Sequence, residues 1–485
     1  MKFIDDFLNN ITMYRLTLYF LIILAVVGLL YSIFGFLPFD PIQYIFSFTL
    51  ILLTCYLINL IFAKVFEAPS NVESFWISAL ILGLIIKPPT NLTETAFIFW
   101  AGVLAMASKY ILAIHRKHIF NPVAISVAIT AFAINGSANW WVGTIVMLPV
   151  VTLGGFLIVR KIRRWDLVLS FLVTALLIIG PGRWLKSLME SPLIFFSTIM
   201  ITEPLTTPPT KLFRIIYGVI IGFLFAPQIH LGAIYTTPEL ALITGDIFSY
   251  IVSPKYKMLL TLKEKLQLTP DTFDFVFAPD SSLKFTPGQY MEFTLDHAQS
   301  DSRGVRRYLS LASSPTENEI RVGVKFGNPP STFKKNLLGL APGQKIMAGQ
   351  LIGDFTLPKD VNKKVVLIAG GIGITPYRSM LKYLVDKNER RDIILLYSAS
   401  RKDEFVYKDV LAEAGQKLGI RTVCVDTETQ GHMDASKITE IVPDYQNRIF
   451  YISGSHGVVN AFENLLKGLK VSSSHIITDY FPGFA

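Results

Sequence analysis

Apolar residues fill the first half of the chain in runs of helical length, with few polar positions between them. A helix that crosses the hydrocarbon core of a bilayer needs about 20 such residues. The pattern therefore predicts about ten membrane-spanning helices, several of them shorter than this length. The predicted spans are 13–37, 42–63, 73–87, 94–114, 122–135, 141–160, 166–181, 190–203, 212–227 and 237–252.

The pattern changes near residue 253, where short alternating strands and turns replace the apolar runs. Residues 257–360 read as a strand meander, which predicts a small antiparallel β-barrel. From residue 363 onward, strand, turn and helix follow one another repeatedly, which is typical of an α/β doubly wound parallel sheet. The predicted domains are a transmembrane domain (1–252), a β-barrel (253–360) and an α/β domain (361–485).

Composition agrees with a membrane protein. Hydrophobic residues make up 51% of the chain and charged residues only 17%, which is too apolar for an ordinary soluble protein. The net charge of +9 does not indicate nucleic acid, because many basic residues lie in short loops beside apolar runs. The two cysteines, Cys55 and Cys424, exclude a disulfide framework and a four-cysteine iron–sulfur site. We predict no metal site and a lipid bilayer as partner.

The distribution of lysine and arginine predicts the orientation. With an even number of spans, the positive-inside rule places both termini and the carboxy-terminal half in the cytoplasm of a multi-pass protein of the cell (inner) membrane. The predicted outside loops carry only Lys87, Arg183 and Lys186. The predicted inside loops carry Lys64, Arg116, Lys117, Arg160, Lys161, Arg163, Arg164, Lys211, Arg214, Lys255 and Lys257.

An internal repeat lies within the apolar half. "LGLIIKPPTNLTETAFIFWAGV" and "IMITEPLTTPPTKLFRIIYGVIIGF" align at an offset of 120 residues, so Pro88-Pro89-Thr90 corresponds to Pro208-Pro209-Thr210. The predicted topology puts the first motif outside and the second inside. This favours an inverted repeat, in which proline-broken backbone surrounds an interior site. The alternative is chance similarity between two apolar segments.

Two carboxylates in this half are candidates for a membrane site. Asp246 falls within the last predicted span, and Glu203 falls at the end of the eighth. A charged carboxylate at mid-membrane costs about 2.5–3.5 kcal/mol, so it usually faces a cavity or a partner. For Glu203, a position at the cytoplasmic interface is the alternative.

Four segments of the apolar half carry a family resemblance: "HIFNPVA" (118–124), "LGGFLIVRKIRRWDLVLSFLVT" (153–174), "IMITEPLTTPPTKLFRIIYG" (199–218) and "GDIFSYIVSPKY" (245–256). They resemble the flavin-carrying membrane subunits of Rnf and sodium-pumping NADH:quinone oxidoreductase complexes. The resemblance implies a ten-helix inverted repeat that carries electrons on flavin. That family has an extracytoplasmic loop with a threonine that takes covalent FMN, whereas this chain has only "INGSANWWVG" (134–143). An additional noncovalent flavin stays open, and a quinone or an extracytoplasmic flavoprotein is the expected acceptor.

The second half resembles the ferredoxin–NADP reductase superfamily along its whole length, beginning with "RRYLSLASSP" (306–315). The resemblance implies that Arg307 pairs with a phosphate of FAD, since a guanidinium offers bidentate geometry. It implies that Ser310 donates its hydroxyl to the hydride-accepting nitrogen, which is a catalytic role. Leu309 stands where relatives have a stacking aromatic; the neighbouring Tyr308 either compensates or packs inside the barrel.

The same resemblance assigns a second flavin loop to "GNPPSTFKKNLLGL". Gly327 allows a close approach, and Ser331 and Thr332 stand at a helix start, where free backbone amides bind pyrophosphate. A plain helix cap is the alternative. Phe481 and Phe484 match the carboxy-terminal aromatics that cover the flavin ring in relatives; hydrophobic anchoring of the tail is the alternative.

A glycine-rich turn is the candidate site for the nicotinamide dinucleotide. "AGGIGITP" follows the apolar strand "VVLIA" and precedes a helix, as a dinucleotide-binding turn requires. The expected contacts are Gly370, Gly371, Gly373, Thr375, Pro376 and Gly454. In the family a cysteine lies near the nicotinamide; Ser453 replaces it here, and we assign it a catalytic role. Asp403 and Glu404, after the basic pair Arg401-Lys402, would repel a 2′-phosphate, so of NADH and NADPH we favour NADH.

Together these features predict a membrane-bound NAD(P)H-dependent flavoprotein oxidoreductase that passes electrons from cytoplasmic NAD(P)H through FAD to a membrane or extracytoplasmic acceptor. The alternative is a membrane transporter or a redox-driven ion pump that the reductase domain regulates or energises. A haem ferric reductase needs paired histidines within its spans. His115 and His118 fall in a loop, and His230 stands alone among the outside loops.

Overall fold

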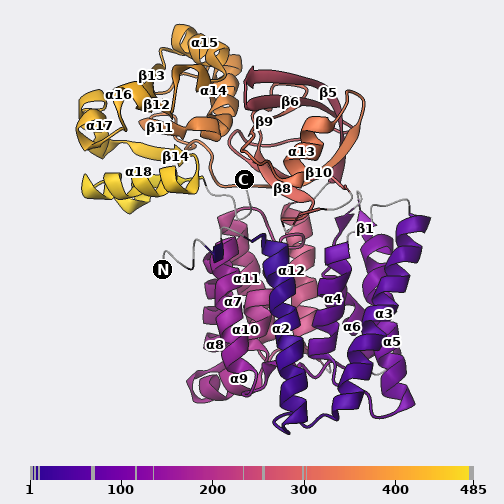
Figure 1. Ribbon diagram of the computed structural model, residues 1–485. Coiled ribbons are helices and arrows are strands. Elements are labelled where there is room, and N and C mark those ends of the chain that lie inside the picture. Colours follow the sequence, from indigo (N-terminus) through magenta and orange to yellow (C-terminus); the bar gives the residue numbers. More distant parts are fainter. Residues whose placement is uncertain are drawn as a thin grey trace. The chain divides into compact units, whose positions relative to one another are not determined.

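The computed structural model describes residues 4, 7–8, 11–66, 72–114, 117–134, 136–232, 234–253, 257–297, 300–301 and 303–479. The chain divides into two compact units, and the main boundary between them falls after Lys257. Figure 1 shows a helical amino-terminal unit, coloured indigo to pink, and a carboxy-terminal unit that contains two sheets. The three predicted domain ranges stay predictions.

The amino-terminal unit contains the same series of elements twice. The first series is α2 (Met13–Ile33), α3 (Pro41–Val65), α4 (Val72–Ile85), α5 (Leu92–Ile111), the hairpin β1 (Ala113–Ile114) and β2 (Lys117–His118), and α6 (Pro122–Ile134). The second is α7 (Leu148–Ile162), α8 (Trp165–Ile179), α9 (Trp184–Glu190), α10 (Leu193–Phe195) with the π-helical turn η3 (Phe196–Met200), α11 (Lys211–Phe225), the hairpin β3 (His230–Leu231) and β4 (Ile234–Tyr235), and α12 (Pro238–Val252).

Helix contacts follow the repeat. Helix α5 packs against α3 and α6, and its counterpart α11 packs against α8 and α12. The two series meet where α2 contacts α7 and where α6 contacts α12, so each of these contacts joins counterpart helices. The Pro-Pro-Thr segments precede α5 and α11, in agreement with the predicted repeat.

The two series run in opposite directions, as the positions of their corresponding ends along α12 show. The carbonyl of Ile85, at the end of α4, accepts the backbone N–H of Trp140 at 2.8 Å, and the Trp140 indole donates to Glu239 in the first turn of α12. Leu205, after η3, instead lines a pocket with Asp246 and other residues from the second half of α12. The ends of α4 and η3 therefore lie near opposite ends of α12, as an inverted repeat requires.

The number of full-length spans is smaller than predicted. Among the described helices, α2 and α3 are the two that are long and apolar enough to cross a membrane by themselves, with 21 and 25 residues and mean hydropathies of 2.5 and 2.3. Helix α8 and the segment Pro181–Glu190, bent by 101°, form a third candidate. The prediction of about ten spans is therefore wrong. Helices buried among other helices are apolar all round, so apolar runs overestimate the count.

The first sheet of the carboxy-terminal unit is antiparallel and has six strands in the order β8-β7-β10-β5-β6-β9. The strands are β5 (Lys257–Thr269), β6 (Thr272–Pro279), β7 (Tyr290–Thr294), β8 (Arg306–Ser310), β9 (Ile320–Lys325) and β10 (Lys345–Ile352). Its inward side chains form one apolar core with Phe333 and Leu337 of α13 (Thr332–Gly339).

The predicted barrel is not closed, because the edge strands β8 and β9 do not form a ladder among the described residues. Directly after β8, one backbone hydrogen bond, from the Ala312 N–H to the Arg321 carbonyl of β9 at 2.8 Å, joins the two edges. The carbonyl of Ala312 accepts from the Arg378 guanidinium at 2.7 Å, and the carbonyl of Ser313 accepts from the Ser379 hydroxyl at 2.6 Å, so side chains of the second sheet's first helix bind this end of the first sheet.

The second sheet confirms the predicted doubly wound fold. Its five parallel strands have the order β13-β12-β11-β14-β15. They are β11 (Val365–Gly370), β12 (Ile393–Ala399), β13 (Arg421–Asp426), β14 (Ile449–Ser453) and β15 (Ile476–Thr478). The longer helices are α14 (Thr375–Lys387), α15 (Lys408–Leu418), α17 (Ala435–Ile441) and α18 (His456–Gly468), and apolar cores on both faces bury the strands.

Candidate functional site

The second sheet has a topological switch point between β11 and β14. From β11 the chain continues to β12 and β13 on one side, and it then returns to β14 on the other side. At such a point the two connections leave the carboxyl ends of adjacent strands in opposite directions and open a crevice that binds ligands. The glycine-rich turn follows β11 and Ser453 ends β14, so the fold brings the two predicted nicotinamide motifs to this crevice.

The two turns touch through their backbones. A Cβ atom on Gly373 would lie 2.3 Å from the carbonyl oxygen of Ser453 and 2.6 Å from the nitrogen of Gly454. Gly371 has a φ of +55°, in the left-handed region that glycine adopts at no cost. A side chain at position 373 would force the turns apart, which explains the glycine there. A Cβ atom on Gly454 would lie 3.3 Å from the carbonyl oxygen of Gly370 and 3.4 Å from its Cα.

Helix α14 begins at this turn with Thr375 and Pro376. The N–H of Thr375 donates to the carbonyl of Ile372 and Pro376 has no N–H, so neither residue offers a free backbone donor to the crevice. The hydroxyl of Thr375 donates to the carbonyl of Ile372 at 3.1 Å and so stabilises the turn. The predicted bond from this hydroxyl to a phosphate stays a prediction.

Ser453 has a buried acidic partner. Its hydroxyl lies 3.1 Å from Oδ2 of Asp479, a residue that is 4% exposed and follows β15. Burial raises the pKa of Asp479 to about 7, and the hydrogen bond from Ser453 opposes part of this increase. Sequence reasoning missed Asp479; an acidic residue directly after an apolar strand was the available signal. Phe481 and Phe484 lie outside the described residues.

The predicted flavin segment forms β8 at the edge of the first sheet. Arg307 pairs with Phe293 and Ser310 pairs with Tyr290 of β7. The Tyr308 hydroxyl lies 3.0 Å from a carboxylate oxygen of Glu292 and 3.1 Å from the amide oxygen of Gln350. Tyr308 thus lies on the same face as Glu292, opposite the face on which Leu309 packs against the apolar core, and its role toward the flavin stays a prediction. Leu309 alternates away from it and is only partly buried.

A cation and a helix start together form an anion site in this sheet. The carboxylate of Asp301 accepts the backbone N–H of Thr332 at 3.0 Å and lies 4.0 Å from the guanidinium of Arg307. The N–H of Asp301 donates in turn to the Thr332 hydroxyl at 3.0 Å. Ser331 caps α13 through Lys334, so the predicted cap exists as well. The donors suit a phosphate, and the Asp301 carboxylate stands in for one.

Gly327, on the same predicted loop, has no atom within 4 Å of the position that a Cβ would take. The backbone is thus open there to a close approach. Sequence reasoning placed Arg307 and Thr332 in the flavin site but missed Asp301, because it lies 31 residues before Thr332.

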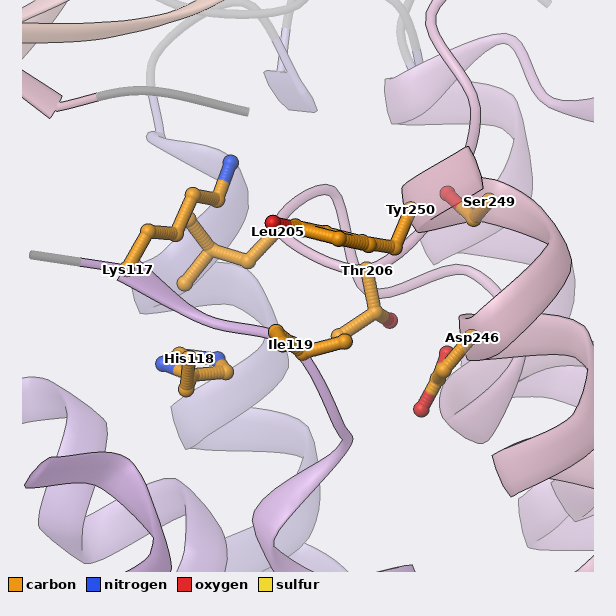
Figure 2. A pocket seen from close by; sticks show the side chains of 8 residues that line it. All are labelled: Lys117, His118, Ile119, Leu205, Thr206, Asp246, Ser249 and Tyr250. Carbon is orange, nitrogen blue, oxygen red and sulfur yellow. The ribbon is translucent and has the colours of Figure 1, made fainter. Parts of the chain in front are cut away.

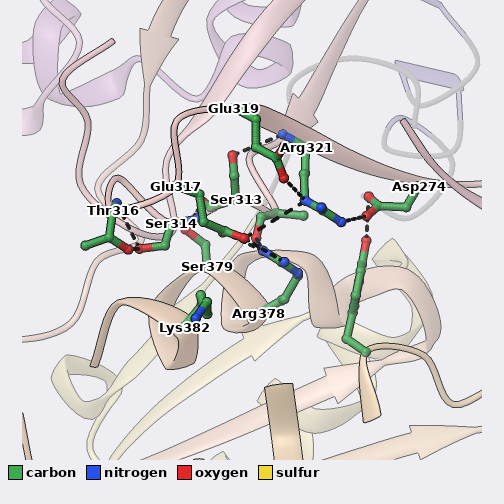
Figure 3. Close-up of polar contacts among 12 residues, drawn as sticks. Asp274, Ser313, Ser314, Thr316, Glu317, Glu319, Arg321, Arg378, Ser379 and Lys382 are labelled. Carbon is green, nitrogen blue, oxygen red and sulfur yellow. Dashed lines mark hydrogen bonds and ion pairs between the residues drawn. The ribbon is translucent and has the colours of Figure 1, made fainter. Parts of the chain in front are cut away.

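A buried ionic network, defined by Asp274, Glu317, Arg321, Arg378 and Tyr407, joins the two sheets (Figure 3). Arg378 donates twice to Glu317, at 2.8 and 2.9 Å, and Arg321 donates to Asp274 at 3.2 Å. Although burial raises the pKa of Glu317, pairing with Arg378 lowers it overall. Burial raises the pKa of Asp274 despite Arg378 and Arg321. The network holds the flavin and nicotinamide segments in one arrangement.

The predicted coenzyme-selecting residues lie after β12. The Arg401 guanidinium is 3.3 Å from Asp403 and 3.7 Å from Glu404, and Lys325 donates to Glu404 at 2.8 Å. Both acidic side chains are thus paired with basic groups that the 2′-phosphate of NADPH would require as its own partners.

In the amino-terminal unit, Asn121 links the two predicted membrane carboxylates. Its backbone N–H donates to Asp246 at 2.7 Å, and its side-chain amide donates to Glu203 at 2.8 Å. The Tyr217 hydroxyl lies 3.2 Å from the other oxygen of Asp246, and His118 lies 3.6 Å from Glu203. Among the described residues, no cluster of three or more His, Cys, Asp or Glu side chains is arranged to hold a metal ion.

Comparisons with known proteins concern the carboxy-terminal half. Residues 367–464 match the oxidoreductase NAD-binding domain. The chain is 26% identical to a flavohemoprotein of Oceanobacillus iheyensis, over 47% of this chain and 58% of that protein. It is 31% identical to an NADPH oxidoreductase of Mycobacterium tuberculosis, over 37% of this chain and 48% of that protein.

Among solved structures, the chain is similar to the FAD/NAD-binding domain of the nitric oxide dioxygenase from Vibrio cholerae, with 23% identity and a TM-score of 0.41. That match covers 46% of this chain and 97% of the other. The chain spans only about half the length of the curated relatives it matches. The resemblance of the amino-terminal half to Rnf-type membrane subunits stays a prediction.

Proposed function

We propose that the protein is a membrane-bound NAD(P)H-dependent flavoprotein oxidoreductase. It takes electrons from NAD(P)H in the cytoplasm and passes them through FAD to an acceptor in or beyond the membrane. The observation that carries this proposal is the switch point between β11 and β14, where the glycine turn and Ser453 meet in a sheet that matches an oxidoreductase NAD-binding domain.

The nicotinamide half of the site rests on the backbone. The close approach of Gly373 to Ser453 leaves a narrow floor of peptide groups, against which the pyrophosphate of the dinucleotide would lie. Ser453 is the last residue of β14, so it lies at the edge of the crevice, and its hydroxyl is oriented by Asp479. We assign Ser453 a role in orienting the nicotinamide for transfer.

The flavin half rests on side chains of the first sheet. Arg307 and the N–H groups of α13 would hold the FAD phosphates after Asp301 withdraws, and Ser310 would donate to the ring. FAD, when bound, accepts a hydride and releases electrons singly. The ionic network between the sheets keeps β8 and the glycine turn in register, because both Ala312 and Glu317 are bound by Arg378 of α14.

The amino-terminal unit supplies the membrane part of the proposal. Helices α2 and α3 can each cross a bilayer, and many of their apolar side chains are exposed. A quinone or an extracytoplasmic flavoprotein is the proposed acceptor, and a noncovalent flavin in this unit is a further proposed carrier.

The test is NADH oxidation by the purified full-length protein. We expect one FAD per carboxy-terminal unit and bleaching of that flavin by NADH. Arg307→Ala should weaken FAD binding at least tenfold, because one charge-assisted contact to phosphate is worth about 1.5–3 kcal/mol. Arg306→Ala, the adjacent arginine near Glu292, is the matched control. No flavin binding and no NADH oxidation, even with added FAD, would refute the proposal.

A second candidate function is a transporter or a redox-driven ion pump, and the inverted repeat with its linked carboxylates favours it. Solute uptake into proteoliposomes without NADH would identify a transporter. Uptake that requires NADH would identify a pump.

A further inference from the structure

A small pocket lies where the two series of the amino-terminal unit meet. Its lining comes from three places in the chain: Lys117, His118 and Ile119 at β2, Leu205 and Thr206 after η3, and Asp246, Ser249 and Tyr250 of α12 (Figure 2). Its free space is about 10 Å³, close to the roughly 10–15 Å³ that one water molecule needs. The pocket is therefore too small for a flavin or quinone ring and has the size of a site for water.

Asp246 forms one wall of the pocket and is 1% exposed. One carboxylate oxygen accepts the Asn121 backbone N–H and the other faces the Tyr217 hydroxyl. These two bonds use two of the roughly four lone-pair positions of the carboxylate, so a water molecule in the pocket can donate to it as well.

Ser249 gives an independent sign that a ligand belongs in this pocket. It lies one helical turn after Asp246, is 1% exposed and lines the same space. Within the described part of the chain its hydroxyl has no hydrogen-bond partner. Leaving a buried hydroxyl unpaired destabilises the folded protein. A water molecule in the pocket removes this cost, because it can bond to Ser249 and Asp246 together.

The site suits a water molecule and a proton rather than a metal ion, because the described residues form no cluster of three or more His, Cys, Asp and Glu side chains that could hold a metal ion. The buried Lys117 also lines the pocket. The other titratable groups around the site are Glu203 and His118, Tyr217 of α11, Tyr250 of α12, and the more distant Lys109 and Lys257.

The counterpart position in the first series has no such site. The repeat offset of 120 residues relates Glu203 to Gly83. The carbonyl of Gly83 accepts from the Trp141 indole at 2.9 Å, and the neighbouring Trp140 indole binds Glu239 at 2.7 Å. Indole rings thus lie at this position in the first series, whereas titratable groups and a pocket lie at the counterpart position in the second series.

We propose that Asp246, Ser249 and one water molecule form a proton-binding site, with Glu203 and His118 as the adjacent groups that exchange protons with it. Exchange breaks the O–H bond of the Asp246 carboxyl and forms one on the pocket water, which passes its own proton on; no oxidant or reductant takes part. This site goes beyond the proposed function. The proposed electron transfer would move charge and so drive repeated proton exchange at the site.

The direct test is infrared difference spectroscopy of the full-length protein during a pH titration, in the region where protonated carboxyl groups absorb. We expect a titrating band that Asp246→Asn abolishes and Asp246→Glu shifts. Ser249→Ala should shift the band as well, because the water loses a partner. Glu239→Gln is the matched control, since Glu239 is a buried carboxylate of the same helix outside the pocket.

Two results would overturn the site. One is a titrating band that persists unchanged in both Asp246→Asn and Asp246→Glu. The other is a band that disappears on adding sodium chloride but not choline chloride, since a metal cation would then displace the proton. Neither result depends on NADH.

Function is tested separately in proteoliposomes that contain a pH-sensitive dye, with NADH and a quinone analogue. Proton movement should fall at least tenfold in Asp246→Asn relative to Glu239→Gln, with each preparation normalised to its reduction of ferricyanide by NADH. If no variant or wild-type preparation oxidises NADH, the proposed function fails, while the infrared result still decides the proton site.

Discussion

Arg378 of α14 holds Glu317 through two parallel hydrogen bonds, 2.8 and 2.9 Å long, and so ties the nicotinamide-binding sheet to the segment that follows the flavin strand. Arg378 also donates to the carbonyl of Ala312 and lies over the Tyr407 ring, 5.5 Å from its centre. One side chain therefore contacts both sheets at three points.

Removing this guanidinium should destabilise the carboxy-terminal unit. Arg378→Met removes both hydrogen bonds to the partly buried Glu317 and leaves it only Arg321, 4.0 Å away, so the cost should lie near the lower end of the about 3–5 kcal/mol that breaking a buried pair costs. Lys382→Met is the control, because its pair with Asp386 one turn further on is more exposed and worth less than about 1 kcal/mol. The measurement is the thermal midpoint at which bound flavin is released. Equal midpoints for the two variants would contradict the structural role of Arg378.

The Ser453–Asp479 pair should make stability depend on pH. The pKa of Asp479 is about 7 in the folded protein and ordinarily 3.8. The folded state therefore binds the proton more tightly, and its stabilising contribution is complete below about pH 4 and lost as pH rises through 7. The full loss is on the order of 4 kcal/mol. Asp479→Asn should flatten unfolding midpoints between pH 4 and 8.

The control for Asp479 is Asp444, a half-buried carboxylate whose pKa is shifted in the opposite direction. Arg448 lowers the pKa of Asp444 to about 2, so its contribution is present above pH 4 and lost as pH falls through 2. Asp444→Asn should therefore lower stability by a constant amount from pH 4 to 8, leave the slope over that range unchanged, and differ little from the wild type near pH 2. A wild-type profile that is flat from pH 4 to 8 would show that Asp479 is not buried.

Asp301 should compete with FAD for the anion site. Asp301→Asn removes the negative charge that faces Arg307 and the start of α13, so FAD should bind several-fold more tightly, by up to about tenfold for a change of 1.4 kcal/mol. Asp296→Asn, an exposed aspartate of the same loop, controls for net charge. Fluorescence titration of the apoprotein with FAD measures both. Weaker binding in Asp301→Asn would mean that Asp301 supports the flavin loop instead.

Asp403 should set the preference for NADH. Asp403→Asn frees Arg401 from its partner at 3.3 Å, so the ratio of kcat/KM for NADPH to that for NADH should rise about twofold to fivefold, as expected for an exposed pair worth up to about 1 kcal/mol. Asp409→Asn, on the exposed face of α15, is the matched control. An unchanged ratio would place the 2′-phosphate elsewhere.

Local order along the chain was predictable from the sequence, because periodicity and turn residues act over short distances. The strand–turn–helix series predicted the parallel sheet, and the glycine turn after β11 lies where expected. The paired Pro-Pro-Thr segments predicted the repeat, which the two series of helices and hairpins reproduce. Arg307 and Thr332 were assigned to one phosphate site, and the structure brings both to the Asp301 carboxylate.

Tertiary structure decided what depends on contacts between distant residues. Asn121 meets Asp246 across 125 positions, and Asp301 meets Thr332 across 31, and no local pattern reports such pairings. Arg378 likewise binds the carbonyl of Ala312, 66 residues away. The predicted number of spans was wrong for a related reason. An apolar run shows only that a helix avoids water, whereas packing decides whether lipid or protein surrounds that helix.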